Sequence, residues 1–182
     1  GKLDAVEINS SFKQRHSRAT YERWAASVPQ EFRFSVKMPQ SITHESELRP
    51  SKADLDSFVE AVAGLGRKLG VLLVQLPPSH EFRSARTRAF FKNLRDRVSC
   101  GLVCEPRHIS WNSVRAEALL AEYRVSRVGA DPPPWEGADI PSGSREIAYF
   151  RLHGSPRRYY SNYERDQLEL IRARIDVASG QS

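Results

Sequence analysis

Six short segments carry the hydrophobic patterns that predict β-strands, at residues 5–9, 32–37, 71–76, 100–105, 125–131 and 147–153. In the first segment, Val6 and Ile8 alternate with Glu7 and Asn9, which is the two-residue period of a strand with one apolar face. Segment 71–76 is a nearly continuous apolar run, which is typical of a parallel strand buried on both faces. Each pattern is short enough to be a single strand of a sheet.

Amphipathic helices are predicted between these strands. Tyr21, Trp24 and Val28 recur at helical spacing after Ser17, a favoured N-cap residue, and Pro29 stops the repeat. The later helices are expected around Leu55 to Leu65, Thr87 to Val98, Ser113 to Tyr123 and Leu168 to Ile175. Strands that alternate with helices through short connections form parallel sheets with right-handed crossovers.

Every predicted strand ends in at least one polar side chain that is expected to face inward. These residues are Glu7, Asn9, Lys37, Gln75, Glu105, Asp131, Arg151 and His153. In a β/α barrel all strand ends converge on one mouth, whereas in an open doubly wound sheet only the strands at the switch point converge. We therefore expect an α/β fold, a TIM-like β/α barrel of parallel strands, in a single domain that spans residues 1–182.

The composition is that of an ordinary globular protein. Hydrophobic residues make up 40% and charged residues 27% of the 182-residue chain, a length that suits one domain. No apolar run approaches the roughly 20 residues of a membrane helix, and the N-terminus carries no charged-then-apolar signal segment. We expect a cytoplasmic protein without a membrane partner.

The formal net charge of +6 makes nucleic acid an alternative partner. It is not the favoured one, because the basic residues are spread along the chain without a tight basic run. The local exception is Arg157-Arg158, which is followed by Tyr159-Tyr160. Since arginine suits bidentate binding of phosphate or carboxylate groups, a small anionic molecule is the expected partner.

Several motifs taken together resemble the DUF72 family, also called YecE-like proteins. They are Val6–Phe12, Phe32–Lys37, Ile42–Glu45, Val74–Ser79, Glu105–Trp111 and Tyr149–Gly154, and their order runs the length of the chain. The resemblance implies a TIM-like barrel with a distant likeness to sugar-isomerase-type barrels, and no established activity. It also implies that the chain carries family strands two to seven, so that a longer natural protein or another chain is expected to supply the first and eighth β/α units.

The polar strand ends and the loops beside them offer candidates for both catalysis and binding. The candidate catalytic residues are Glu7, Glu105 and His153, and the candidate substrate-binding residues are Asn9, Lys37, Gln75, Arg107, His108, Trp111, Asp131, Arg151 and Tyr160. Carboxylates and a histidine are suited to general acid–base catalysis. In the alternative interpretation the acids only pair with neighbouring Lys and Arg side chains, and Trp111 packs its loop instead of stacking on a ligand.

The same rim is unfavourable for metal chemistry. Lys37, Arg107 and Arg151 are interleaved with the acids, so any ion bound there is expected to be an anion, and no metal or cofactor is expected. Cys100 and Cys104 lie on the apolar face of one strand, too far apart for a disulfide and too few for a zinc site. Three functions stay open: an acid–base enzyme for an anionic or sugar-like substrate, a phosphoester hydrolase or nucleic-acid-acting enzyme, and a non-catalytic ligand-binding barrel.

Overall fold

Strands and helices alternate along the chain in the computed structural model, which describes residues 3–155, 157, 159–178 and 180. The strands are β1 (Ala5–Ile8), β2 (Arg33–Lys37), β3 (Leu69–Gln75), β4 (Gly101–Glu105), β5 (Val125–Arg127), β6 (Gly129–Asp131), β7 (Ser142–Gly143) and β8 (Phe150–Leu152). The α-helices are α1 (Arg18–Ala26), α2 (Lys52–Val62), α3 (Ser84–Arg95), α4 (Val114–Glu122) and α5 (Arg165–Ala178). Short helical turns η1 (Ser10–Phe12), η2 (Ser41–Glu45), η3 (Ala63–Lys68) and η4 (Ile109–Trp111) connect them.

The strands form a mainly parallel sheet. Strands β1 to β5 lie in sequence order, and β7 adds an antiparallel neighbour to β5. Only Val128 separates β5 from β6, and its N–H donates to the Cys104 carbonyl oxygen at 2.8 Å, so β5 and β6 follow one path beside β4. Strand β6 then pairs in parallel with β8. This order is that of the predicted TIM-like β/α barrel.

The backbone ladder is open between the two outer parallel strands. Among the described residues, β1 pairs with β2 alone and β8 pairs with β6 alone. A smaller barrel closed by direct pairing of β1 with β8 is therefore not observed in this part of the chain. The expectation that further β/α units complete the barrel stays a prediction.

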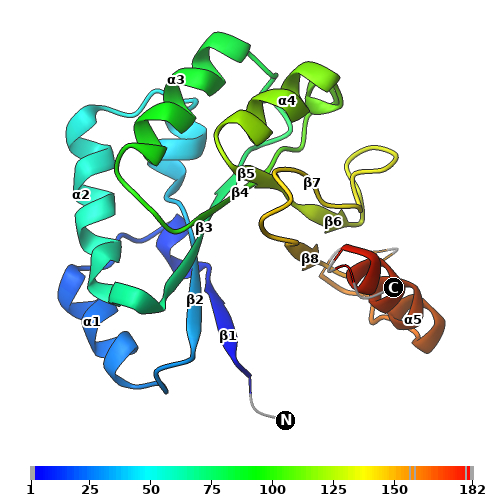
Figure 1. The fold of residues 1–182 in the computed structure, drawn as a ribbon, viewed down its shortest axis with the longest axis horizontal. Helices are drawn as coiled ribbons and strands as arrows, with labels where there is room; N and C mark the ends of the chain where they lie inside the picture. Colours follow the sequence, from blue (N-terminus) through cyan, green and yellow to red (C-terminus); the bar gives the residue numbers. More distant parts are fainter. Residues whose placement is uncertain (1–2, 156, 158, 179, 181–182) are drawn as a thin grey trace.

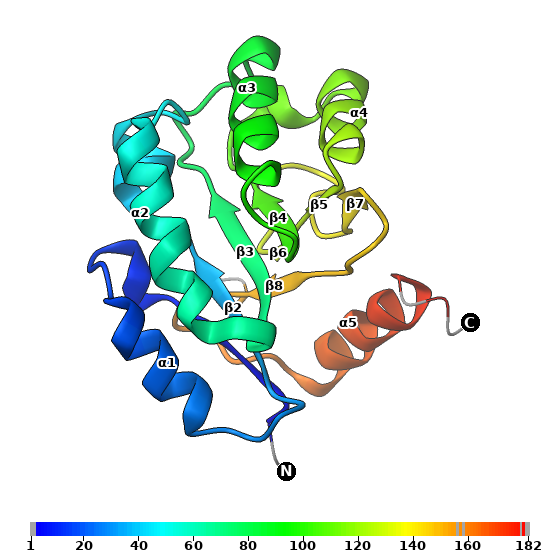
Figure 2. The same cartoon turned by 60° about the vertical axis from the view of Figure 1, so that its left-hand side comes forward.

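The sheet buries apolar side chains on both of its faces. On the outer face, strand residues such as Val36, Leu72 and Cys104 are fully buried among the apolar faces of the helices, and α1 to α4 follow one another around this side (Figures 1 and 2). On the inner face, Leu73, Val103 and Val128 form a smaller buried cluster. Partly buried side chains pack against it, namely Val71, Ile147 and Tyr149. The inner cluster forms an apolar floor beneath the strand ends.

Local sequence signals explain where several helices begin. Ser17 and Ser113 are the N-caps of α1 and α4, as predicted, because their hydroxyl groups accept from Thr20 N at 3.3 Å and from Ala116 N at 3.2 Å. Segment 147–153 is a strand only at Phe150–Leu152, because its partner β6 has just three residues. Strand β7 was not predicted, since two residues are too short to show a period.

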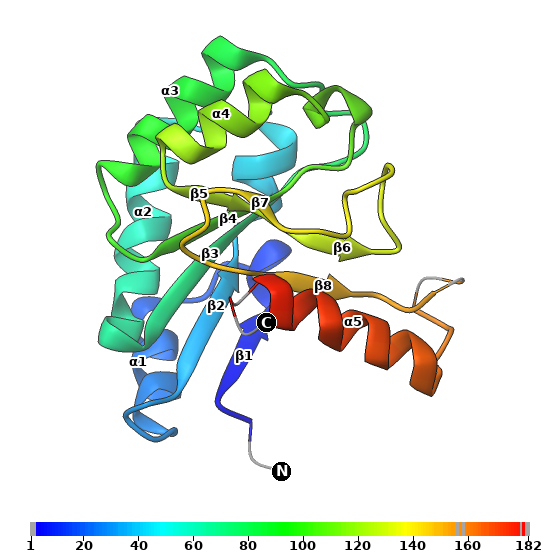
Figure 3. The same ribbon diagram turned by 45° about the vertical axis from the view of Figure 1, so that its right-hand side comes forward.

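Helix α5 lies apart from the other helices (Figures 2 and 3). Of its apolar side chains only Ile171 is buried, whereas Leu170 and Val177 are exposed. These two residues line a groove of about 610 Å³ together with Ile140, Ile147 and other residues of the preceding loop. No helix in the described part of the chain is both long enough and apolar enough to span a bilayer.

Candidate functional site

Arg151 occupies the centre of a polar group at the carboxyl ends of the strands. Its Nε and Nη2 atoms donate to the two carboxylate oxygens of Glu7 at 3.1 and 2.7 Å, across the gap between β8 and β1. Its Nη1 atom donates to Gln75 Oε1 at 3.0 Å and also to Glu105 Oε2. One guanidinium thus joins side chains from β1, β3, β4 and β8. We call Glu7, Lys37, Gln75, Glu105, Arg107, Arg151 and His153 the strand-end cluster.

Strand register explains why these side chains meet. Gln75 lies beside Glu105 in the β3–β4 ladder, and Lys37 lies beside Leu73, a member of the inner apolar cluster. Residues that are neighbours in a parallel ladder point to the same face of the sheet. The inner face therefore changes from apolar to polar toward the strand ends, as the sequence pattern predicts.

Glu105 is the most deeply buried acid of the cluster, with 3% of its side chain exposed. Arg107 Nε and Nη2 both donate to its Oε1 atom, at 3.0 and 2.8 Å, while Arg151 binds the other oxygen. Burial acts to raise the pKa of Glu105, but His153 and the charges of Arg151 and Arg107 outweigh it and lower the pKa to about 2. Because His153 Nε2 is 3.9 Å from Glu105 Oε1, beyond hydrogen-bond distance, we attribute the lowering mainly to the two guanidiniums.

Glu7 is held from two sides. Besides its two bonds from Arg151, it accepts the Tyr149 hydroxyl proton at 2.6 Å, and Ser35 Oγ lies 2.8 Å from the same phenolic oxygen. Burial acts to raise the pKa of Glu7, and Arg151 outweighs it, so the net shift is downward. Burial and the Glu7 charge raise the pKa of Tyr149. Sequence reasoning missed Tyr149 and Ser35, although each lies two residues before a cluster residue on the same face of its strand.

Lys37 differs from the other charged members of the cluster. Its Nζ atom lies 3.8 Å from the centroid of the Phe12 ring. Among the described residues, no carboxylate lies within 4.0 Å of this atom, whereas both carboxylates and both guanidiniums of the cluster form ion pairs. Burial lowers the pKa of Lys37, and the charges of Arg151 and Arg107 lower it further, against Glu105 and Glu7, to about 8.

His153 belongs to the strand-end cluster, whereas Asp131 does not join it. The His153 side chain is 8% exposed, and its buried Nε2 atom has no hydrogen-bond partner among the residues that the structure describes. Asp131 lies beside Leu152 in the β6–β8 ladder, whereas Ala130 lies beside Arg151. The side chain of Asp131 therefore points to the opposite face, where it accepts the Tyr163 hydroxyl proton at 2.5 Å.

The remaining predicted binding residues lie around the rim or in the loops. Asn9 Oδ1 accepts from Arg151 Nη2 at 3.3 Å and so borders the cluster. His108 Nδ1 is 2.8 Å from Ser110 Oγ, and the buried indole of Trp111 donates to the His80 carbonyl at 3.0 Å. These contacts order the loop after β4, and a ligand contact by either residue stays a prediction.

The predicted basic and aromatic run reaches the strand-end cluster through Tyr159, whose ring centroid lies 5.4 Å from that of the His153 ring. Tyr160 is exposed, and its ring centroid lies 4.0 Å from the guanidinium carbon of Arg157. Arg158, the other arginine of that run, lies outside the described residues. A binding role for Tyr160 stays a prediction.

The charges of the strand-end cluster leave an excess of positive charge. Glu7 and Glu105 carry two negative charges, while Arg107, Arg151 and protonated Lys37 carry three positive ones. In the described part of the chain, no group of three or more His, Cys, Asp or Glu residues has the arrangement of a metal site. The net charge of these five side chains would be balanced by one negative charge.

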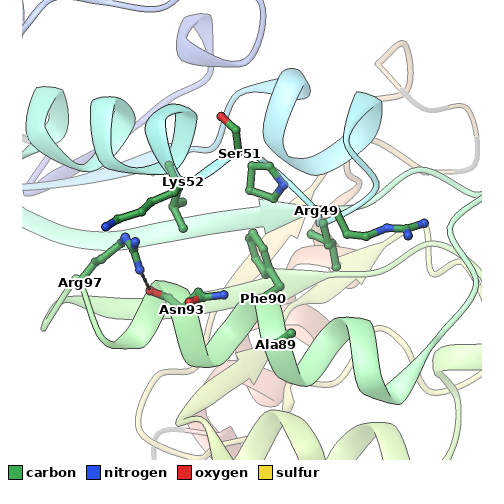
Figure 4. Close-up of a pocket in the computed structure, with 10 residues that line it drawn as sticks. Arg49, Ser51, Lys52, Ala89, Phe90, Asn93 and Arg97 are labelled. Atoms are coloured by element: carbon green, nitrogen blue, oxygen red, sulfur yellow. Dashed lines mark hydrogen bonds between the residues drawn. The ribbon is translucent and has the colours of Figure 1, made fainter.

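A separate pocket of about 270 Å³ lies between α2 and α3 and is lined by Arg49, Lys52, Phe90 and Arg97, among others (Figure 4). Its Arg97 guanidinium is already bound to Asp56 at 2.6 Å and to the Asn93 carbonyl at 2.8 Å. None of its lining residues belongs to the strand-end cluster. We therefore treat the pocket as a crevice between helices.

Comparison with known proteins shows one family. Two crystal structures of a DUF72 family protein from Enterococcus faecalis V583 match 99% of this chain. One has a TM-score of 0.82 at 19% identity, and the match covers 75% of its own chain. The other has a TM-score of 0.81 at 21% identity, and the match covers 79% of its own chain. A DUF72 family protein from Thermotoga maritima MSB8 matches with a TM-score of 0.78 at 25% identity, over 98% of this chain and 74% of its own. No curated protein matches the chain significantly. Since the model of the family described as "Protein of unknown function DUF72" matches residues 1–182, the chain belongs to the DUF72 family.

Proposed function

We propose that the protein binds a small anionic, sugar-like molecule at the strand-end cluster. The observation that carries the proposal is the state of Lys37, a half-buried cation at a strand end without a carboxylate partner among the described residues. The guanidinium groups of its neighbours Arg107 and Arg151 are instead ion-paired with Glu105 and Glu7. A phosphate or carboxylate group would supply the missing counter-charge and accept hydrogen bonds from the ammonium group.

The ion pairs of Glu7 and Glu105 favour a role for these carboxylates in positioning Arg151 over a role in proton transfer. The pKa of Glu105, at about 2, keeps its carboxylate ionised at neutral pH, so it is a weak proton donor there. Glu105 and Glu7 instead fix the plane and position of Arg151 through buried ion pairs. In this proposal His153 is the proton carrier, because its buried Nε2 atom has no hydrogen-bond partner in the described part of the chain.

Sulfate titration tests the proposed anion site, because sulfate keeps the same charge across the neutral pH range. Calorimetry at pH 7 should give one saturable site in the wild-type protein and roughly ten-fold weaker binding in Lys37→Met, the loss of one hydrogen-bonded charge. Lys92→Met is the matched control, since Lys92 is an exposed lysine that pairs with Asp96 at 2.9 Å. Equal sulfate affinity in wild type and Lys37→Met, or no saturable binding, would overturn the proposal.

A further inference from the structure

Lys37 has the surroundings of a reactive amine. It lies at the carboxyl end of β2 on the inner face of the sheet, where the other strand ends converge. The Phe12 ring covers its Nζ atom at 3.8 Å. Two other lysines are engaged differently: Lys68 Nζ donates to the carbonyls of Ala25 and Val28 at 2.6 and 2.7 Å, and Lys92 is ion-paired with Asp96.

These surroundings make the neutral amine accessible near neutral pH. A pKa of about 8 leaves about a quarter of the Lys37 side chains unprotonated at pH 7.5, against about 0.1% for an ordinary lysine. Lysines that form Schiff bases are activated in the same way, by desolvation or by neighbouring cationic groups. Both causes act here, since Lys37 is half-buried and the Arg151 and Arg107 charges act on it.

We propose that Lys37 Nζ forms a Schiff base with the carbonyl carbon of an anionic aldehyde or ketone held at the strand-end cluster. The inference rests on the proposed function, because the same cluster must first bind the anionic part of the molecule. It narrows the substrate class from anions in general to those that carry a carbonyl group. A second cation of the cluster, Arg107 on the loop that follows β4, can contact the anionic group while Lys37 reacts with the carbonyl group.

The proposed reaction balances without an oxidant, a reductant or a metal. The neutral Lys37 amine attacks the carbonyl carbon, a C–N bond forms, and the π electron pair moves to the carbonyl oxygen. That oxygen takes one proton from the attacking nitrogen and a second from solvent, and it leaves as water when the nitrogen lone pair forms the C=N bond. The product is a protonated imine with the same charge as the lysine ammonium. The ionised carboxylates of Glu105 and Glu7, whose charges favour the charged form of Lys37, stabilise this product as well.

Reductive trapping in the wild-type protein tests the inference. Glyoxylate, a small anionic aldehyde, is added at pH 7.5 with cyanoborohydride, which delivers a hydride to the C=N bond and leaves a stable carboxymethyl-lysine. Peptide mass spectrometry then gives the labelling rate at each lysine of the same molecule. We expect labelling of Lys37 at least about ten-fold faster than that of Lys92, and loss of the fast site in Lys37→Arg. Excess sulfate should protect Lys37 and leave Lys92 unaffected.

The outcomes separate this inference from the anion site on which it rests. If sulfate binds in the titration but Lys37 is labelled no faster than Lys92, the Schiff base is refuted and the anion site stands. If Lys37 is labelled rapidly but sulfate neither binds nor protects it, the anionic substrate class is refuted together with the proposed function. Rapid, sulfate-protected labelling of Lys37 supports both.

Discussion

Removal of the Arg151 guanidinium should destabilise the protein strongly, because it leaves two acids without their main partner. In Arg151→Met the buried Glu105 keeps only Arg107, and Glu7 keeps the Tyr149 hydroxyl. Breaking a buried ion pair by removal of one partner costs about 3–5 kcal/mol. Since both acids retain one partner, and 19% of the Glu7 side chain is exposed, we expect the lower end, about 3 kcal/mol.

Urea denaturation followed by circular dichroism measures this loss in the free energy of unfolding. Arg165→Met is the matched control, because Arg165 forms an ion pair with Glu169 in which 91% and 67% of the side chains are exposed, and its loss should change stability by no more than about 0.5 kcal/mol. Adding Glu7→Gln to Arg151→Met should recover part of the loss, since it removes an unpaired buried charge. A cost below about 1 kcal/mol for Arg151→Met would refute the ion-pair argument.

Three further results are expected. The folded-state pKa of Glu105, at about 2, is below its ordinary value of 4.5, so its stabilisation is complete above pH 4.5 and is lost as the pH falls toward 2. Urea denaturation at pH 6 and pH 3 should therefore show a smaller loss of stability on acidification in Glu105→Gln than in wild type, and equal losses would contradict this. The affinity for sulfate should fall by up to about ten-fold as the pH rises through about 8, where Lys37 loses its proton. A sulfate affinity that stays constant in calorimetry up to pH 9.5 would rule out Lys37 as the residue that binds the anion. Trp111→Phe should lower the free energy of unfolding by about 1–2 kcal/mol in thermal denaturation, because the buried His80 carbonyl loses its 3.0 Å hydrogen bond from the indole. An unchanged stability would mean that a water molecule replaces this hydrogen bond.

The sequence was sufficient to predict much of the sheet and part of the strand-end cluster. The apolar run at 71–76 became β3, and the polar residue that ends it, Gln75, lies beside Glu105 as the pattern of strand ends predicts. Hydrophobic burial sets these positions, and its two-residue period is visible in a single sequence. The helix N-caps Ser17 and Ser113 were predictable for a similar reason, because their hydrogen bonds are local.

Contacts between segments that are far apart in the sequence could not be predicted from a hydrophobic pattern. Asp131 was expected to face inward, but β5 and β6 place Val128 and Ala130 on the inner face, so Asp131 lies on the other. Tyr149 was missed because its partners Glu7 and Ser35 are 142 and 114 residues away. The sequence therefore predicted a mixed rim of charges. That Lys37 has no carboxylate partner within the described part of the chain emerged only from the structure.

A crystal of the protein soaked with selenate, an anion with the shape and charge of sulfate and a strong anomalous signal, tests the central claim most directly. The account predicts an anomalous peak within hydrogen-bond distance of Lys37 Nζ, on the inner side of the strand ends and close to Arg107. Selenate peaks confined to other surfaces, or a divalent cation held between Glu7 and Glu105 after a metal soak, would contradict it.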